Sequence, residues 1–121
     1  MPRARSSGRR TAKYRFELLV PTTYNDGRPV EMPKVQAVRE TLIARFGGCR
    51  VQPAAPYQGW WVHQDHTYED WLLLFTVEGD RTEANLHWFE GYKREMLASF
   101  EQEEIYLAVI QLQWLERGAN S

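Results

Sequence analysis

A run of polar, titratable side chains lies in the middle of the sequence. His63, Asp65, His66, Glu69 and Asp70 fall close together, and imidazole with carboxylate is a ligand set that suits zinc, iron or manganese. On a strand, His63 and Asp65 would share a face while His66 points elsewhere, so only a turn could bring them together. A solvated hairpin turn also fits this spacing. We therefore expect no metal or other cofactor, and keep a metal-dependent hydrolase or nuclease that uses His63, Asp65, His66 and Asp70 as an alternative.

Other reactive side chains lack the partners that catalysis needs. Cys49 follows the pair Gly47-Gly48 and has no accompanying His-Asp or His-Asn motif, which is typical of a small buried hydrophobe. His87 falls off the apolar stripe of an expected helix, as a surface residue would. The two glycines are too short a run to cradle phosphate, and no dinucleotide, P-loop or hydrolase-elbow motif is present. These features favour a protein that is not an enzyme.

Aromatic residues point to an interface instead. Tyr57, Trp60 and Trp61 lie in and after a loop rich in Pro and Ala, and consecutive strand residues point to opposite faces. One Trp could enter the core while the other lies on an open sheet face, where exposed apolar area usually marks an interface. Tyr106 and Trp114 on the last expected strand could join it. Local packing of both rings under the loop is the alternative, but we expect a homo-oligomer or a protein partner.

The N-terminal segment is strongly basic. Residues 1–13 carry Arg3, Arg5, Arg9, Arg10 and Lys13 and no acid, a charge of +5, while the rest of the chain sums to −6. Such a tail can hold nucleic acid through phosphate contacts, which need charge rather than structure. A nucleic-acid-binding protein is therefore a second alternative, opposed by the acidic body and by the ordinary use of such tails for solubility.

The apolar periodicity changes along the chain between the strand and helix patterns. Alternating residues from Tyr14 to Val20 indicate a half-buried strand, and Asn25-Asp26-Gly27 indicates a turn. Gly47-Gly48 would end the first helix, and Asp80 with Glu83 resembles a capping box for the second. The expected elements are a strand over 14–20, a helix over 34–46, a strand over 49–52 that resumes over 60–63, a turn over 64–67, a strand over 70–78, a helix over 80–100 and a strand over 105–114.

The order β-α-β-β-α-β predicts one α+β domain, a ferredoxin-like two-layer sandwich over residues 14–115. Its antiparallel four-stranded sheet should have the order 4-1-3-2, with both helices on one face. Residues 1–13 are expected to be a disordered basic tail, and residues 116–121 a flexible C-terminus. The residues expected to face the sheet are Val35, Val38, Leu42, Phe46, Phe89, Tyr92, Met96 and Phe100.

Short motifs in this chain resemble a family of short uncharacterised bacterial proteins. The features shared are a strand ending in Pro21, the Asn-Asp-Gly turn, the Phe-Gly-Gly helix end, Gly59-Trp60 and a late Gln102-Glu103. The resemblance covers about residues 14–110. It implies the ferredoxin-like pattern and brings no function with it.

Composition agrees with a globular protein. Hydrophobic residues make up 43% and charged residues 26% of the 121 residues. A single cysteine allows no internal disulfide, and no apolar run is long enough for a secretion signal or a membrane span. We expect a cytoplasmic protein, with an Arg- and Ser-rich transit peptide as the alternative. The function expected is a small binding or accessory module that acts through an exposed apolar sheet face and self-associates.

Overall fold

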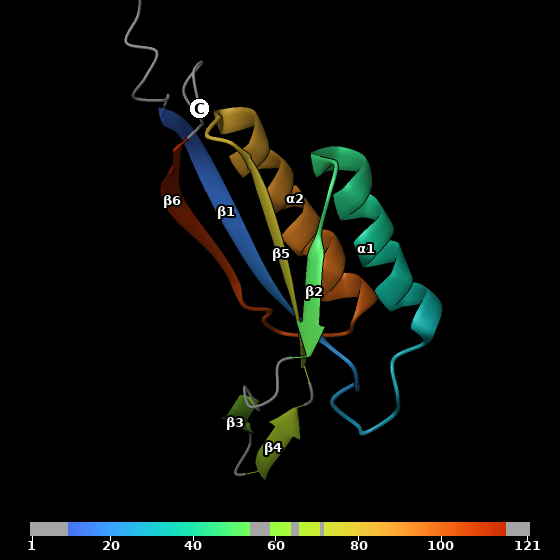
Figure 1. Ribbon diagram of the computed structural model, residues 1–121. Helices are drawn as coiled ribbons and strands as arrows, with labels where there is room; N and C mark the ends of the chain where they lie inside the picture. Colours follow the sequence, from blue (N-terminus) through green and yellow to red (C-terminus); the bar gives the residue numbers. More distant parts are fainter. Residues whose placement is uncertain (1–9, 54–58, 64–65, 71, 116–121) are drawn as a thin grey trace, which may run out of the picture.

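The computed structural model describes residues 10–53, 59–63, 66–70 and 72–115; for Arg10 and for residues 59–63 and 66–70 it describes the backbone alone. The elements alternate in the expected way, with one additional hairpin (Figure 1). They are β1 (Arg10–Pro21), α1 (Met32–Phe46), β2 (Arg50–Pro53), β3 (Gly59–His63), β4 (His66–Asp70), β5 (Leu72–Asp80), α2 (Glu83–Ser99) and β6 (Leu107–Leu115).

Four antiparallel strands form the main sheet in the order β2-β5-β1-β6. This is the predicted 4-1-3-2 order once the extra hairpin is left out of the count. Figure 1 shows α1 and α2 together on one side of this sheet. The prediction of a ferredoxin-like α+β sandwich is confirmed.

The prediction that residues 60–63 resume the second strand is wrong. β3 and β4 pair with each other in a separate two-stranded sheet, which projects beyond the end of the main sheet (Figure 1). β2 ends at Pro53, opposite Leu73 of β5, and proline has no N–H to donate to a ladder. The long strand predicted from Asp70 accordingly divides, so that Asp70 ends β4 and β5 begins at Leu72.

Long-range pairing also moves the start of β1. The strand begins at Arg10 rather than Tyr14, because its first residues pair with the end of β6, as Arg10 does with Leu115. A pairing partner more than a hundred residues away leaves no local signal in the sequence. Residues 1–9 of the predicted tail lie outside the described residues.

The two helix ends show one correct and one wrong cap prediction. Gly47 adopts φ 84° and donates its N–H to Ile43 O at 2.8 Å, so the predicted glycine cap of α1 is confirmed. The capping-box prediction for α2 is wrong. The N-cap is Thr82, whose hydroxyl accepts from the Asn85 N–H at 3.2 Å, while Asp80 is the last residue of β5.

The core lies between the sheet and the helices. Phe16 of β1 stacks on Phe89 of α2 with ring centroids 4.0 Å apart, and Phe46 of α1 joins them at 5.9 and 5.4 Å. Six of the eight residues predicted to face the sheet are buried, and Phe46 and Tyr92 are half-buried against the same core. Among the described residues, neither helix is long and apolar enough to cross a membrane.

Candidate functional site

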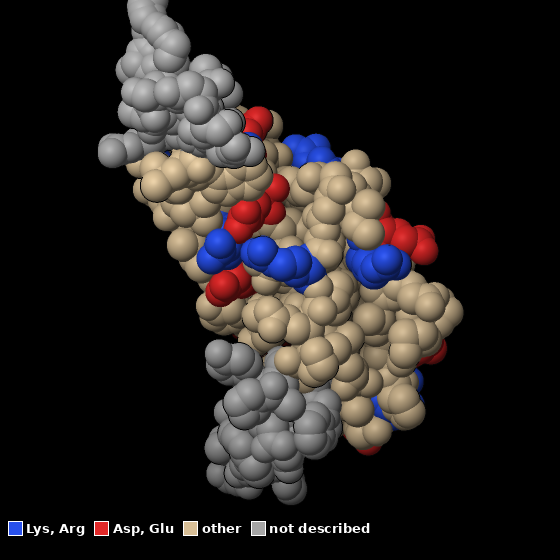
Figure 2. All heavy atoms as spheres, viewed as in Figure 1, with Lys and Arg blue, Asp and Glu red and all other residues tan. Residues whose placement is uncertain are grey.

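The face of the sheet opposite the helices carries a charged network. Phe16 is buried under the helices, so its strand neighbours Arg15 and Glu17 point to the open face. Glu78 of β5 is the register partner of Arg15 and shares that face. Figure 2 shows basic and acidic side chains gathered over the middle of the sheet. The predicted apolar face is therefore charged at its centre.

Glu78 is the acceptor at the centre of this network. Arg15 donates to its carboxylate from Nε at 2.9 Å and from Nη2 at 2.7 Å, and Arg50 donates at 3.4 Å. The indole Nε1 of Trp114 donates to the other oxygen at 3.1 Å. The hydrogen bonds from Arg15 hold the pKa of Glu78 below its ordinary value. One carboxylate thus fixes two guanidinium groups and one indole ring.

A hollow of about 470 Å³ opens beside this network, where β1 begins and β5 ends. Lys13 forms an ion pair with Asp80 at 2.8 Å and places its ammonium over the Trp114 ring, 4.6 Å from the centroid. The hollow is lined by Lys13, Arg45, Phe46, Glu78, Gly79, Asp80, Asn85 and Trp114. The hollow therefore combines charges of both signs with an exposed aromatic ring.

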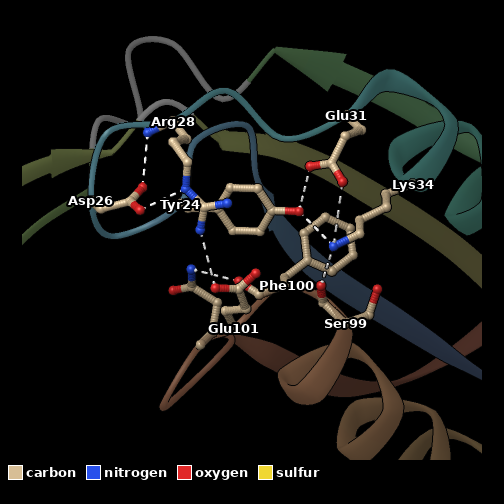
Figure 3. Close-up of polar contacts among 9 residues, drawn as sticks. Tyr24, Asp26, Arg28, Glu31, Lys34, Ser99, Phe100 and Glu101 are labelled. Atoms are coloured by element: carbon tan, nitrogen blue, oxygen red, sulfur yellow. Dashed lines mark hydrogen bonds and ion pairs between the residues drawn. The ribbon is translucent and has the colours of Figure 1, made fainter.

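A second polar cluster closes the opposite end of the molecule (Figure 3). Tyr24 donates to Glu31 at 2.6 Å and accepts from Lys34 at 2.5 Å, and Lys34 also donates to Ser99 O at 2.6 Å. The contact to Ser99 O satisfies one of the carbonyls that the end of α2 leaves free. The contacts of Lys34 therefore fasten the loop before α1 to the end of α2.

Arg28 also links this loop to the residues after α2, and it stabilises the turn predicted at Asn25-Asp26-Gly27. Its guanidinium donates to Asp26 at 2.6 Å and to Glu101 at 3.2 Å, and it lies 4.5 Å from the centroid of the Tyr24 ring. Gly27 supplies φ 91° at the turn. The cluster is engaged throughout in holding the loop, so we assign it a structural role.

The two edges of the main sheet differ sharply. β2 is four residues long and contains Arg50 and Pro53, and short length, charge and proline are the devices that protect a sheet edge from pairing. β6 is nine residues long, and Leu107 to Leu115 include no charged residue and no proline. Among the described strands, β6 pairs with β1 alone. One edge is therefore blunted and the other is open.

Two of the five predicted interface aromatics have described side chains, and both are exposed. Tyr106 is 53% exposed just before β6, and Trp114 is 44% exposed near its end. By register, Trp114 lies on the open face, as predicted. Tyr57 lies outside the described residues, and so do the side chains of Trp60 and Trp61.

The predicted metal ligands cannot be assembled from the described residues. His63 and His66 are register partners at the tip of the β3–β4 hairpin, but their side chains and that of Asp70 lie outside the description, as does Asp65. Among the side chains that are described, no group of three or more His, Cys, Asp or Glu residues could hold a metal.

Some of the remaining candidate residues have described side chains and others do not. Cys49 is half-buried, and burial raises the pKa of its thiol, as befits a packing residue rather than a nucleophile. Of the basic-tail residues, Lys13 is part of β1 beside Asp80. Arg10 has a described backbone only, and Arg3, Arg5 and Arg9 lie outside the described residues.

The network around Glu78 was not predicted from the sequence. A signal for it was present: Lys13, Arg15 and Glu17 alternate with the apolar residues of the first strand and so share its open face. That Glu78 would lie opposite Arg15 depends on the β1–β5 register, which no local pattern determines. The site is a product of strand pairing.

Comparison with known proteins bears on the fold alone. No family model matches this sequence, and no curated protein matches it. One solved structure that is similar is a phage SAM lyase in complex with S-methyl-5'-thioadenosine, with a TM-score of 0.57 and 11% identity over 95% of each chain. At that identity the likeness shows a shared fold.

Proposed function

We propose that this protein is a small binding module that works as a homodimer, with β6 as its interface. The observation that carries this proposal is the contrast between the two sheet edges. An unpaired strand presents backbone donors and acceptors that another strand can satisfy, and natural proteins protect such edges when they must stay single. β2 has that protection, and β6, with no charge and no proline, lacks it.

The outward backbone groups of β6 suit antiparallel pairing with β6 of a second copy of this chain. Leu19 donates its N–H to Tyr106 O at 3.1 Å, and hydrogen-bonding direction alternates along an antiparallel strand. The outward backbone groups therefore belong to Leu107, Val109, Gln111, Gln113 and Leu115. A two-fold axis through Gln111 would pair Val109 with Gln113 of a second copy and Leu107 with Leu115. That register uses all five outward residues.

Side chains on both faces of β6 support the same interface. Ile110 and Trp114 are exposed on the open face, and Val109 and Leu115 are exposed on the helix side. A two-fold axis perpendicular to the sheet keeps each set on its own face, so both apolar strips would meet their copies. Burying such strips adds to the hydrogen bonds of the joined sheet.

The alternatives find less support among the described residues. The phage SAM lyase supports a module of this fold, but 11% identity transfers no site residue from one chain to the other. The metal-dependent hydrolase depends on His63, Asp65, His66 and Asp70, and stays a prediction. Tyr57, Trp60 and Trp61 likewise stay predicted members of the interface.

A matched pair of substitutions tests the dimer. Val109 on β6 and Val51 on β2 are 42% and 40% exposed, and both point to the helix side of the sheet. Light scattering and sedimentation should report a dimer for the wild type and for Val51→Lys. For Val109→Lys the dissociation constant should rise about tenfold or more, equivalent to ~1.4 kcal/mol.

Cross-linking tests the register. In a Cys49→Ala background, Gln111→Cys places two thiols across the proposed axis, where Cα atoms would be about 5.5 Å apart. We expect an oxidised dimer that Gln52→Cys, on the other edge, does not form. A wild type that stays monomeric at high concentration, or a Val109→Lys variant that dimerises as the wild type does, would refute the proposal.

A further inference from the structure

The hollow of about 470 Å³ beside Trp114 is lined by basic and acidic side chains in equal number. The basic ones are Lys13 and Arg45, and the acidic ones are Glu78 and Asp80. A ligand with a single net charge would be attracted by one pair and repelled by the other. A ligand that carries a charge of each sign can use both pairs.

The charges that surround the hollow are also mixed in sign. Arg15 and Arg50 both donate to Glu78, so partners outside the hollow compensate that carboxylate. Glu17 lies on the same open face, level with Arg50. The turn after β5 and the first position of α2 add one residue of each sign, Arg81 and Glu83. These surroundings therefore give no large excess of either charge.

Arg45 is the cation of this lining whose partners in the described contacts are all neutral. Its Nη2 donates to Asn85 Oδ1 at 3.1 Å, and its Cζ lies 5.3 Å from the centroid of the Trp88 ring and 5.9 Å from that of Phe46. These contacts orient the guanidinium group without neutralising it. Because a guanidinium group can bind a carboxylate through two parallel hydrogen bonds, Arg45 suits the acidic group of a ligand.

Asp80 can bind a group of the opposite charge. Lys13 contacts one of its carboxylate oxygens, Oδ1, at 2.8 Å, and the side chain of Asp80 is 71% exposed. Among the described contacts, the other oxygen, Oδ2, has no hydrogen-bond or ion-pair partner. An ammonium group of a ligand can therefore bind to Asp80 while Lys13 keeps its place.

The indole ring of Trp114 gives the hollow an aromatic wall. Glu78 accepts from its Nε1 at 3.1 Å, and this bond draws the ring from β6 across β1 toward β5. The side chain is still 44% exposed, although Lys13 lies 4.6 Å from the ring centroid. A ring that is both exposed and held in place favours stacking with a flat ring of a ligand. The volume of the hollow is also within the range of small-ligand sites.

We propose that this hollow binds an aromatic amino acid, with the carboxylate on Arg45, the ammonium group on Asp80 and the ring against Trp114. Both charged groups of such a ligand are ionised near neutral pH, and together they match the two signs of the lining. This goes beyond the dimer, which uses the edge of β6. Arg45 and Asp80 belong to α1 and β5, so the two proposals can fail separately.

Titration of the protein with L-phenylalanine, followed in N–H correlation NMR spectra, tests this proposal. The indole resonance of Trp114, assigned by its loss in Trp114→Phe, should shift with a dissociation constant of about 1 mM or lower. Phenethylamine lacks the carboxylate, phenylpropionate lacks the ammonium group and L-alanine lacks the ring. Each of these three compounds should bind at least about fivefold more weakly than L-phenylalanine.

Each charged residue of the site has a matched ligand control. Arg45→Gln should weaken L-phenylalanine about tenfold and should not weaken phenethylamine, which has no carboxylate to lose. Asp80→Asn should likewise weaken L-phenylalanine and should not weaken phenylpropionate. Arg39→Gln removes an exposed cation of α1 that does not line the hollow, and should leave every affinity within about twofold of the wild type.

Three results would overturn the proposal. The first is an indole resonance of Trp114 that does not shift at about 10 mM L-phenylalanine. The second is phenylpropionate or phenethylamine binding as tightly as L-phenylalanine. The third is an Arg45→Gln variant that binds L-phenylalanine as the wild type does, or that weakens phenethylamine to the same extent.

Discussion

Replacing Gly79 by alanine tests how tightly β5 packs on α1. A Cβ at Gly79 would lie 2.8 and 2.9 Å from two ring atoms of Phe46, and 3.2 Å from the Asn85 amide nitrogen. Ordinary carbon contacts are near 3.5–4.0 Å, so the ring would have to move by most of an ångström. Phe46 is held against Phe16, Trp88 and Phe89, with centroids 5.4–5.9 Å apart. That shift would disturb the aromatic core.

Overpacking of this kind costs about 1–3 kcal/mol, partly offset because alanine restricts the unfolded chain by about 0.4–1 kcal/mol. We therefore expect Gly79→Ala to lower the free energy of unfolding by ~1–2 kcal/mol in urea titrations. Gly48→Ala is the control, since a Cβ there meets nothing within 4 Å. It should be neutral or slightly stabilising.

Phe46→Leu in the same background distinguishes a ring clash from other causes. The smaller side chain leaves room for the new Cβ, so the cost of Gly79→Ala should fall when both changes are combined. If Gly79→Ala unfolds at the same urea concentration as the wild type, or costs the same with Leu at position 46, the close approach of β5 to Phe46 is not what requires glycine.

Two further predictions concern electrostatics and capping. The pKa of Glu78 is lowered in the folded state, so its contribution to stability is present above the ordinary value of 4.5 and is lost as the pH falls through the lowered pKa. The stability measured between about pH 6 and pH 3 should therefore fall less steeply in Glu78→Gln than in the wild type, and parallel curves would contradict this. Thr82→Ala removes the acceptor of the Asn85 N–H and should lower the free energy of unfolding by about 1 kcal/mol in thermal or urea unfolding. Thr82→Ser should keep most of the stability, and equal losses in both variants would show that the hydroxyl does not stabilise the helix as a cap.

The fold was predictable because local signals agreed with one another. The alternation over Tyr14 to Val20, the helical stripe ending at Phe46 and the glycine cap at Gly47 each indicated one element, and their order admitted one common architecture. Failures occurred where long-range pairing overrode those signals. The early start of β1 depends on its pairing with Leu115. The β3–β4 hairpin forms a sheet of its own, although the unbroken apolar sequence from Trp71 onward had predicted a single strand over 70–78.

The candidate site was less predictable for the same reason. Trp114 could be proposed from its type and its position on an edge strand. Its anchor, Glu78, lies thirty-six residues away and is brought to Trp114 by way of β1. Type and spacing identify groups that are near in sequence, such as His63 and His66. They do not predict a cluster whose residues come from four different strands.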